Sequence, residues 1–380
     1  MPEPTRRRVP ADTLFAAALR AVQRHPVKSL QAWNPRLATL DSGRLRSRCS
    51  GTELRSHILR ALALGRGWHD GTAPPELLAA AEAICLANST KLTIDGVARV
   101  AELAGPGLEA LDLTNQFVIT DALVARVAQS CPALRVLSLV GCRKVTGASV
   151  DSLLRLPHLA SVDLGGCLNI ATDAVLRLLV EHPNASRFTG LGIAGLAEPR
   201  ILEAVTKRTG ALTWLSLGYS LATSSALLAA ATANPHLAAL LVHWCDHADD
   251  EVLGGVAAAC PALFHIDVTG CKGVTNAGII AFAGARAECG AGSSAAGAAL
   301  PVDVSSPAAR KWDLDETEWL DFALRSARAA AADLLVGEGD KEETAGPRRF
   351  LRIIAAKHSG VTRAVAEPLN RMSAVLQLLV

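Results

Sequence analysis

Aromatic residues make up only 4% of this 380-residue chain and Tyr219 is its sole tyrosine, although half of all residues are hydrophobic. A core of Leu, Val, Ile and Ala suits many copies of a small unit better than one bulky globular centre. The net charge is only +2, so no overall field favours nucleic acid or a membrane surface as a partner. No uninterrupted run of 18 apolar residues predicts a membrane span.

Motifs of catalysis are also missing from the chain. It has no GxxxxGK[ST] loop, no HExxH, no GxSxG and no GxGxxG. We therefore expect no enzymatic activity, no cofactor and no small-molecule substrate. The nine cysteines include no CxxC pair, which favours a reduced intracellular protein over a disulfide framework.

A nearly constant period dominates the middle of the chain. Strand-like segments with leucines in an L-x-x-L-x-L pattern begin at Leu108, Leu134, Leu159, Ala185, Leu212, Leu237 and Leu263. Successive starts are about 26 positions apart, a spacing typical of repeats that contain one strand and one helix. The fourth copy is irregular, with Phe188 and Gly190 in place of strand leucines. Lys91–Val97 is similar to Lys144–Val150, which indicates a degenerate copy before the first.

A second signal follows the strands. Cys142, Cys167, Cys245 and Cys271 recur at one position of the repeat, and Cys131-Pro132 and Cys260-Pro261 open the next strand. The pattern C-P-x-L-x-x-L-x-L-x-x-C-x-x-[VI]-T closely resembles the cysteine-containing leucine-rich repeats of F-box–leucine-rich-repeat proteins. The resemblance extends over the segment 81–284. It implies a protein-binding adaptor of a ubiquitin ligase complex.

The predicted fold class is α/β: a leucine-rich-repeat solenoid (horseshoe) with a parallel inner sheet, outer helices and helical N- and C-terminal caps. Strands of about 3–5 residues should start near each leucine above. Helical runs such as 121–128 and 173–179 begin next to Thr or Asp, which can cap them. The four recurring cysteines should be buried, reduced thiols.

The predicted domains are a helical N-terminal region at 1–80, the repeats at 81–284, a flexible linker at 285–312 and a helical C-terminal region at 313–380. Val9–Leu14 and Pro75–Leu78 are faintly similar to the opening of an F-box, with a simple helical cap as the alternative reading of 1–80. Residues 313–336 are predicted as a helix and 348–380 as a basic helical tail, which either caps the solenoid or docks elsewhere. The expected location is cytoplasm or nucleus. The arginines near the start leave a mitochondrial presequence as an alternative.

One cluster suggests a metal site. His243, Cys245 and His247 alternate and could point three ligand atoms the same way in an extended segment. However, Cys245 stands at the repeat position that predicts burial, so we interpret the cluster as structural and expect no metal.

The inner face carries the candidate binding residues. Outward strand positions contain no Lys or Glu, which favours an interaction surface, although inner strands that are simply poor in charge remain an alternative. Trp214 is the predicted anchor, because Leu212, Leu215 and Leu217 fill the inward positions and leave its indole exposed. Cover of Trp214 by the 313–336 helix or the C-terminal tail is the competing account. The predicted site comprises Arg187, Leu191, Trp214, Leu241, His243, His265 and Asp267.

The sequence thus predicts a non-catalytic protein–protein interaction module, with protein partners on the concave face and a role as substrate-recognition adaptor of a ubiquitin ligase. The alternative is a permanent structural subunit of a larger organellar or cytoskeletal assembly.

Overall fold

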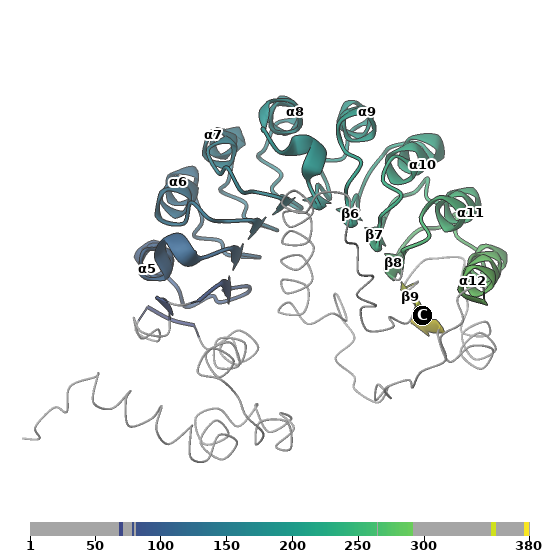
Figure 1. Ribbon diagram of the computed structural model, residues 1–380, viewed down its shortest axis with the longest axis horizontal. Coiled ribbons are helices and arrows are strands. Elements are labelled where there is room, and N and C mark those ends of the chain that lie inside the picture. Colours follow the sequence, from purple (N-terminus) through teal and green to yellow (C-terminus); the bar gives the residue numbers. More distant parts are fainter. Residues whose placement is uncertain are drawn as a thin grey trace, which may run out of the picture.

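The computed structural model describes residues 68–70, 78–79, 81–263, 265–291, 351–354 and 376–379. The repeats form an arch in which short parallel strands line the inner side and the helices line the outer side (Figure 1). This is the predicted α/β leucine-rich-repeat solenoid. The arch curves because helices are wider than strands, so each repeat is a wedge.

Each repeat contributes one strand of three residues, in agreement with the predicted length. The strands of the repeats are β1 (Ala83–Cys85), β2 (Ala110–Asp112), β3 (Val136–Ser138), β4 (Ser161–Asp163), β5 (Gly190–Gly192), β6 (Trp214–Ser216), β7 (Ala239–Leu241) and β8 (His265–Asp267). They pair in chain order, and every pairing is parallel. Strand β1 confirms the degenerate copy expected before the first regular repeat.

The strand register fixes where each repeat begins. Ala83, Ala110, Val136, Ser161, Gly190, Trp214, Ala239 and His265 are successive partners. The residue two positions before each of these opens a repeat, so the fourth of the expected copies opens at Phe188 and not at Ala185. The interval before this copy is the longest of the series and the interval after it the shortest, because the extra turn η5 (Ala185–Arg187) lengthens the preceding connection.

Helices cover the outer side of the sheet. They are α5 (Ile94–Ala104), α6 (Asp121–Ser130), α7 (Val150–Leu154), α8 (Thr172–Glu181), α9 (Pro199–Arg208), α10 (Ser224–Thr232), α11 (Asp250–Ala259) and α12 (Asn276–Ala291), with 3-10 turns η3 (Gly105–Gly107) and η4 (Gly147–Ser149). Helix α12 runs to Ala291 and so extends into the segment 285–312 that the sequence predicted as a linker, whose remaining residues lie outside the described part. In the described part of the chain, no helix combines the length and apolarity needed to cross a membrane.

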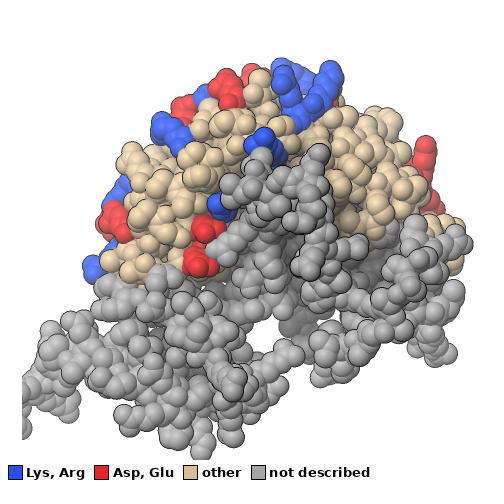
Figure 2. Space-filling model, viewed as in Figure 1, with Lys and Arg blue, Asp and Glu red and all other residues tan. Residues whose placement is uncertain are grey.

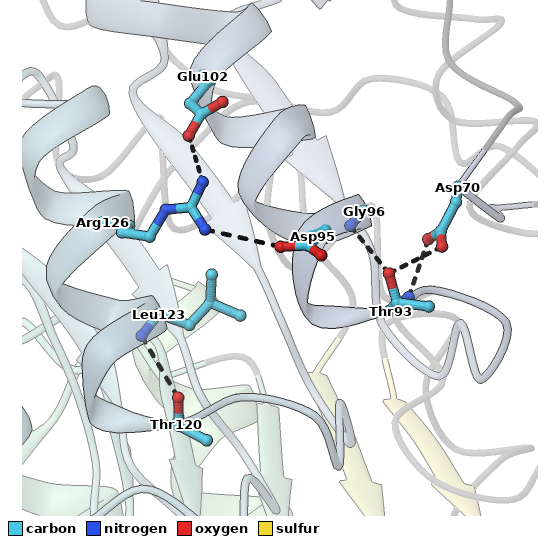
Figure 3. A network of polar contacts seen from close by, with 8 residues as sticks. All are labelled: Asp70, Thr93, Asp95, Gly96, Glu102, Thr120, Leu123 and Arg126. Atoms are coloured by element: carbon cyan, nitrogen blue, oxygen red, sulfur yellow. Dashed lines mark hydrogen bonds and ion pairs between the residues drawn. The ribbon is translucent and has the colours of Figure 1, made fainter.

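Threonine and aspartate start many of these helices, as the sequence predicted. The Thr93 hydroxyl accepts the Gly96 N–H at 3.1 Å, and Thr120 caps α6 in the same way (Figure 3). The cap also joins neighbouring repeats, because the Asp70 carboxylate accepts the Thr93 N–H at 2.9 Å and its hydroxyl at 2.8 Å. The Asp121 carboxylate accepts the same two hydrogen bonds from Thr146, and the Asp250 carboxylate accepts them from Thr275. These bonds connect neighbouring repeats on the outer side of the stack.

The recurring cysteines fix the interior. Cys142, Cys167, Cys245 and Cys271 are free and fully buried, as expected. Each thiol donates to a carbonyl oxygen of the preceding repeat, at 3.2 Å to Leu113, 3.0 Å to Leu139, 3.4 Å to Leu217 and 3.0 Å to Val242. Where the cysteine is missing, Gln116 and Ser220 hold the same position and also donate to the preceding repeat, whereas Leu196 fills it with an apolar side chain after Gly195. In six of the eight described repeats the position therefore holds a donor to the preceding repeat, which indicates a structural role for the thiols.

The end of the chain corrects a prediction. Instead of the helical tail expected at 348–380, β9 (Leu351–Ile354) and β10 (Leu376–Leu379) extend the sheet in parallel beside β8. Leu351 pairs with Leu376, 25 positions later, which is the period of the repeats. The predicted helix at 313–336 and the helices and F-box-like segments of 1–80, apart from 68–70 and 78–79, lie outside the described residues.

Candidate interaction surface

Two rows of side chains run across the inner face, because side chains two apart in a strand share a face. The first row contains Ser161, Gly190, Trp214, Ala239 and His265, and the second contains Asp163, Gly192, Ser216, Leu241 and Asp267. The structure thus brings four of the seven predicted site residues, Trp214, Leu241, His265 and Asp267, onto three neighbouring strands.

Trp214 is not the exposed anchor that its position predicted. Only 1% of its surface is exposed. The indole lies across Gly190 of β5 toward Ser161 of β4, so that a side chain added at Gly190 would collide with it, and Ala239 packs against it. Strand β5 has no side chain at position 190 and so leaves room for the ring within the face, whereas the competing account, cover by the 313–336 helix or the C-terminal tail, involves segments that lie mostly outside the described residues. Leu241 and His265 are also almost completely buried.

The register error in the fourth copy misplaced two predicted residues. Leu191 pairs with Val162 and Leu215 and is a fully buried core residue, not an inner-face residue. Arg187 is exposed, but it ends η5 before the strand and does not stand in either row. Neither belongs to a surface centred on β6–β8.

His243 and Asp267 do come together. His243 Nδ1 lies 3.8 Å from Asp267 Oδ2, with both side chains about one-fifth exposed, at 19% each. The His243 ring lies over Gly218 and is nearly perpendicular to the Tyr219 ring, at an angle of 87° and a centroid distance of 5.3 Å. The expected pair therefore sits beside a tyrosine that the sequence reading did not select.

Carboxylates are buried on the same face toward the start of the arch. Burial raises the pKa of Asp163 to about 7. The Gly165 N–H, which the carboxylate accepts at 2.9 Å, lowers this pKa, and the nearby Asp112 raises it by a smaller amount. Burial likewise raises the pKa of Asp112, whose carboxylate accepts the Thr114 N–H at 2.8 Å. Low dielectric favours the neutral form of both groups.

A left-handed residue lies three positions after the last residue of each strand in the eight repeats. The residues are Asn88, Asn115, Gly141, Gly166, Gly195, Tyr219, Trp244 and Gly270, with φ between 56° and 76°. The N–H of each of the first seven donates to a carbonyl of the next repeat at 2.6–2.9 Å, while the chain turns inward to the donor position described above. We call this row the turn edge. Glycine and asparagine suit it because they tolerate this backbone region.

Tyr219 and Trp244 are exceptions in that row. Their rings are parallel within 3° at a centroid distance of 6.3 Å, and Tyr219 is 59% exposed while Trp244 is 36% exposed. Bulky residues in the left-handed region cost about 1–2 kcal/mol each. Two strained aromatic residues side by side on the surface therefore need an explanation other than core packing.

Other apolar side chains lie exposed two positions further along these turns. Phe117, Leu168 and Leu221 each follow the left-handed residue by two and are 53%, 69% and 83% exposed. The sequence contains a signal for this surface, because Tyr219 and Trp244 align with Gly141, Gly166 and Gly270 of other repeats. A prediction based on strand positions alone does not include these turn residues.

From the sequence, the cluster of His243, Cys245 and His247 is interpreted as structural rather than as a metal site. Among the residues that the structure describes, no group of three or more His, Cys, Asp and Glu could hold a metal ion. Cys245 points into the interior, where burial raises the pKa of its thiol to about 11.

Comparisons with known proteins give little beyond the fold. No protein-family model matches the chain, and no curated protein matches its sequence. Among solved structures, the chain is similar to one described as the Rad7 and Elc1 complex in yeast, with 14% identity, 70% of this chain and 93% of that chain covered, and a TM-score of 0.35. It is also similar to the leucine-rich repeat-containing protein LegL7 from Legionella pneumophila, with 15% identity, 64% and 78% coverage, and a TM-score of 0.36.

Proposed function

We propose that this chain is a non-catalytic protein-binding solenoid and that it holds a partner along the turn edge at β6–β8, next to His243 and Asp267. One observation carries the proposal: two aromatic side chains remain exposed in strained backbone, at positions where other repeats have Gly or Asn. Exposed aromatic residues beside polar groups are typical of interaction hot spots. The adjoining inner-face residues of β6–β8 form the rest of the proposed site.

This surface replaces Trp214 as the anchor. Trp214 is buried against Gly190 and Ala239, so we assign it to the support of the inner face. Arg187 and Leu191 are left out of the proposed site for the reasons given above. His243 links the turn edge to Asp267 and the inner face.

Site-specific photo-crosslinking tests the proposal. A photo-reactive amino acid is placed either at Leu221, which is 83% exposed two positions after the turn-edge residue Tyr219, or at Val180, 52% exposed on the outer helix α8. We expect a discrete protein adduct from position 221 that disappears in a Tyr219→Asn/Trp244→Gly background and is absent from position 180. Asn and Gly already occupy equivalent turns, so this background should fold normally. Equal adducts at both positions, or an adduct unaffected by the double substitution, would contradict the proposal.

For the wider role, we propose a substrate-recognition adaptor of a ubiquitin ligase. The support is the resemblance of the repeats to those of F-box–leucine-rich-repeat proteins, and it predicts that residues 1–80 dock a ligase scaffold. Co-purification of such a scaffold with the full chain, and its loss on deletion of 1–67, is the expected result. Retention of the scaffold after that deletion, or its absence from the full chain, would contradict this role.

A further inference from the structure

The inner side of the first four strands is buried, although its own side chains are small. Ala110 is fully buried, and Asp112 and Asp163 are only 4% and 5% exposed. The strand partners of Ala110 are Ala83 and Val136, whose short side chains stand beside it on the sheet and do not reach over it. We call the inner side of β1–β4, from Ala83 to Asp163, the start face.

The described elements do not account for this burial. The helices of the repeats lie on the outer side of the sheet, and β9 and β10 follow β8 at its other end (Figure 1). Among the described residues, the apolar cluster that contains Ala110 and Val136 has no member from outside β1–β4 and the two positions next to these strands. A further segment of the chain is therefore needed to keep water from the start face.

The chain between α12 and β9 is long enough to reach it. Residues 131–135 join α6 to β3, whereas residues 292–350 join α12 to β9. From β8 to β1 the sheet spans seven strand spacings, about 34 Å. Residues 292–312 extend over as much as about 65–70 Å, so the helix that the sequence predicts at 313–336 is within reach of β1–β4.

The edge of the start face carries charges in a defined order. Glu82, Glu109 and Arg135 directly precede β1, β2 and β3, and Arg187 lies before β5. Two acidic side chains are therefore followed by two basic ones along the sheet, and Figure 2 shows acidic and then basic side chains along the inner edge of the visible face. Glu109 and Arg135 form an ion pair, with 3.2 Å between Arg135 Nε and Glu109 Oε2.

The predicted helix carries the same order of charges along one side. Glu318, Asp321, Arg325 and Arg328 are three or four positions apart, so they share a side of a helix. The side next to them is apolar and includes Leu324. From position 318 to 328 such a helix spans about 15 Å, close to the four strand spacings of about 19 Å between β1 and β5.

We propose that residues 313–336 dock as a helix on the start face, with their acidic end toward Arg135 and Arg187 and their basic end toward Glu82 and Glu109. This direction follows the path of the chain, which comes from the β8 end of the sheet and so brings the acidic end to β5 and β3 first. The start face is then an internal docking surface, occupied by the chain itself. The inference goes beyond the proposed function and does not depend on it, because the proposed partner site lies at β6–β8.

Thiol labelling at Cys85 tests the docking. Cys85 is a free cysteine on the inner side of β1 and is 5% exposed. In the full chain, residues 313–336 are replaced by a Gly/Ser segment of equal length, and labelling by N-ethylmaleimide is followed for each cysteine by mass spectrometry. We expect Cys85 to react at least about tenfold faster than in the parent, while Cys142 and Cys167 of the core stay slow and show that the repeats remain folded. An unchanged rate at Cys85 overturns the proposal.

Charge reversal tests the orientation without removing the segment. Arg325→Glu/Arg328→Glu should speed the labelling of Cys85 about threefold to tenfold, the effect of losing two exposed ion pairs. Adding Glu82→Arg/Glu109→Arg to that variant should restore the slow rate, because the charges are exchanged and opposite signs again face each other. Failure of the second pair to restore protection overturns the proposed orientation.

Asp315→Arg/Asp333→Arg is the matched control. These two positions lie on the opposite side of the predicted helix from Leu324, so the control should change the labelling rate of Cys85 by less than about twofold. An equal rise in the control means that net charge and not the docked side matters, and it overturns the proposal. Faster labelling of Cys85 after deletion of residues 1–67, but not after replacement of 313–336, assigns the start face to the N-terminal segment and also overturns it.

Discussion

The buried carboxylate of Asp163 makes a quantitative prediction about stability and pH. Its pKa is raised from an ordinary value of 3.8 to about 7, chiefly by burial. A carboxyl whose pKa is higher in the folded than in the unfolded state binds protons more tightly when folded. Its contribution to stability is therefore largest below pH 4 and is lost as the pH rises through about 7.

The magnitude follows from linkage. Between pH 5 and pH 8, the two pKa values predict a loss of about 2–3 kcal/mol in the free energy of unfolding from this one group. Asp163→Asn removes the titration and keeps an oxygen that can accept the Gly165 N–H, as Asp163 Oδ1 does at 2.9 Å. The variant should resemble the protonated parent, so it should be more stable than the parent at pH 8 and nearly equal at pH 4.

Urea unfolding of parent and variant at pH 4, 5, 6, 7 and 8 measures this directly. Asp173→Asn is the matched control, because its carboxylate is 84% exposed on the outer side, and it should leave the slope with pH unchanged. An Asp163→Asn variant that is less stable than the parent at pH 8 would refute the reasoning, since it would show that the charged carboxylate is the favoured form in the fold.

The remaining predictions concern the interior. Trp214→Ala should lower the free energy of unfolding by about 3–5 kcal/mol, because the indole is buried, and thermal unfolding compared with Trp244→Ala should show the larger loss at 214. Gly190→Ala should destabilise by about 1–3 kcal/mol, because the new methyl group collides with Trp214 and Ser161, and an unchanged thermal midpoint would contradict the assigned position of the ring. Cys271→Ser should cost less than Cys271→Ala, about 1 against about 2 kcal/mol, because Ser220 already donates from this position in another repeat. In the native parent, labelling of Cys167 and Cys271 by a thiol reagent should be slow at neutral pH, since burial raises both pKa values to about 12.

The regular repeats could be predicted because their sequence and structure share one period. Three-residue strands, Thr and Asp caps and buried thiols all follow from side chains that repeat in register, such as Thr120 and Cys142. The prediction was wrong for the fourth copy because this copy departs from the common period. Phe188 opens it in place of leucine, and η5 lengthens the connection before it, so an alignment by even spacing chose Ala185 and moved Leu191 from the core to the surface.

The candidate site was harder to predict because exposure depends on neighbouring strands. Trp214 stands at an outward position, but its ring occupies the space left by the missing side chain of Gly190, which belongs to the preceding repeat and is adjacent in the sheet. Tyr219 and Trp244 follow the strands and were left out of a reading that considered only strand positions. Their departure from Gly and Asn is visible only after the repeats are aligned on the correct register.

The parallel strands β9 and β10 continue the sheet of the repeats beside β8. His265 pairs with Arg352, 87 positions later, whereas neighbouring partners in the repeats are 24–29 apart. Strands β8 and β9 are therefore far apart in sequence, while β8, β9 and β10 are adjacent in the sheet. A stack of repeats tolerates such a separation because each strand needs only its two neighbours, and the entropy cost of bringing chain segments together rises slowly with their separation, by about 0.6 kcal/mol for each doubling. Since β9 covers the edge of β8, the residues of β8 that belong to the proposed site, His265 and Asp267, lie within the sheet and not at its open end. The proposed binding surface at β6–β8 is thus held on both sides by paired strands, which give His243, Tyr219 and Trp244 a rigid support.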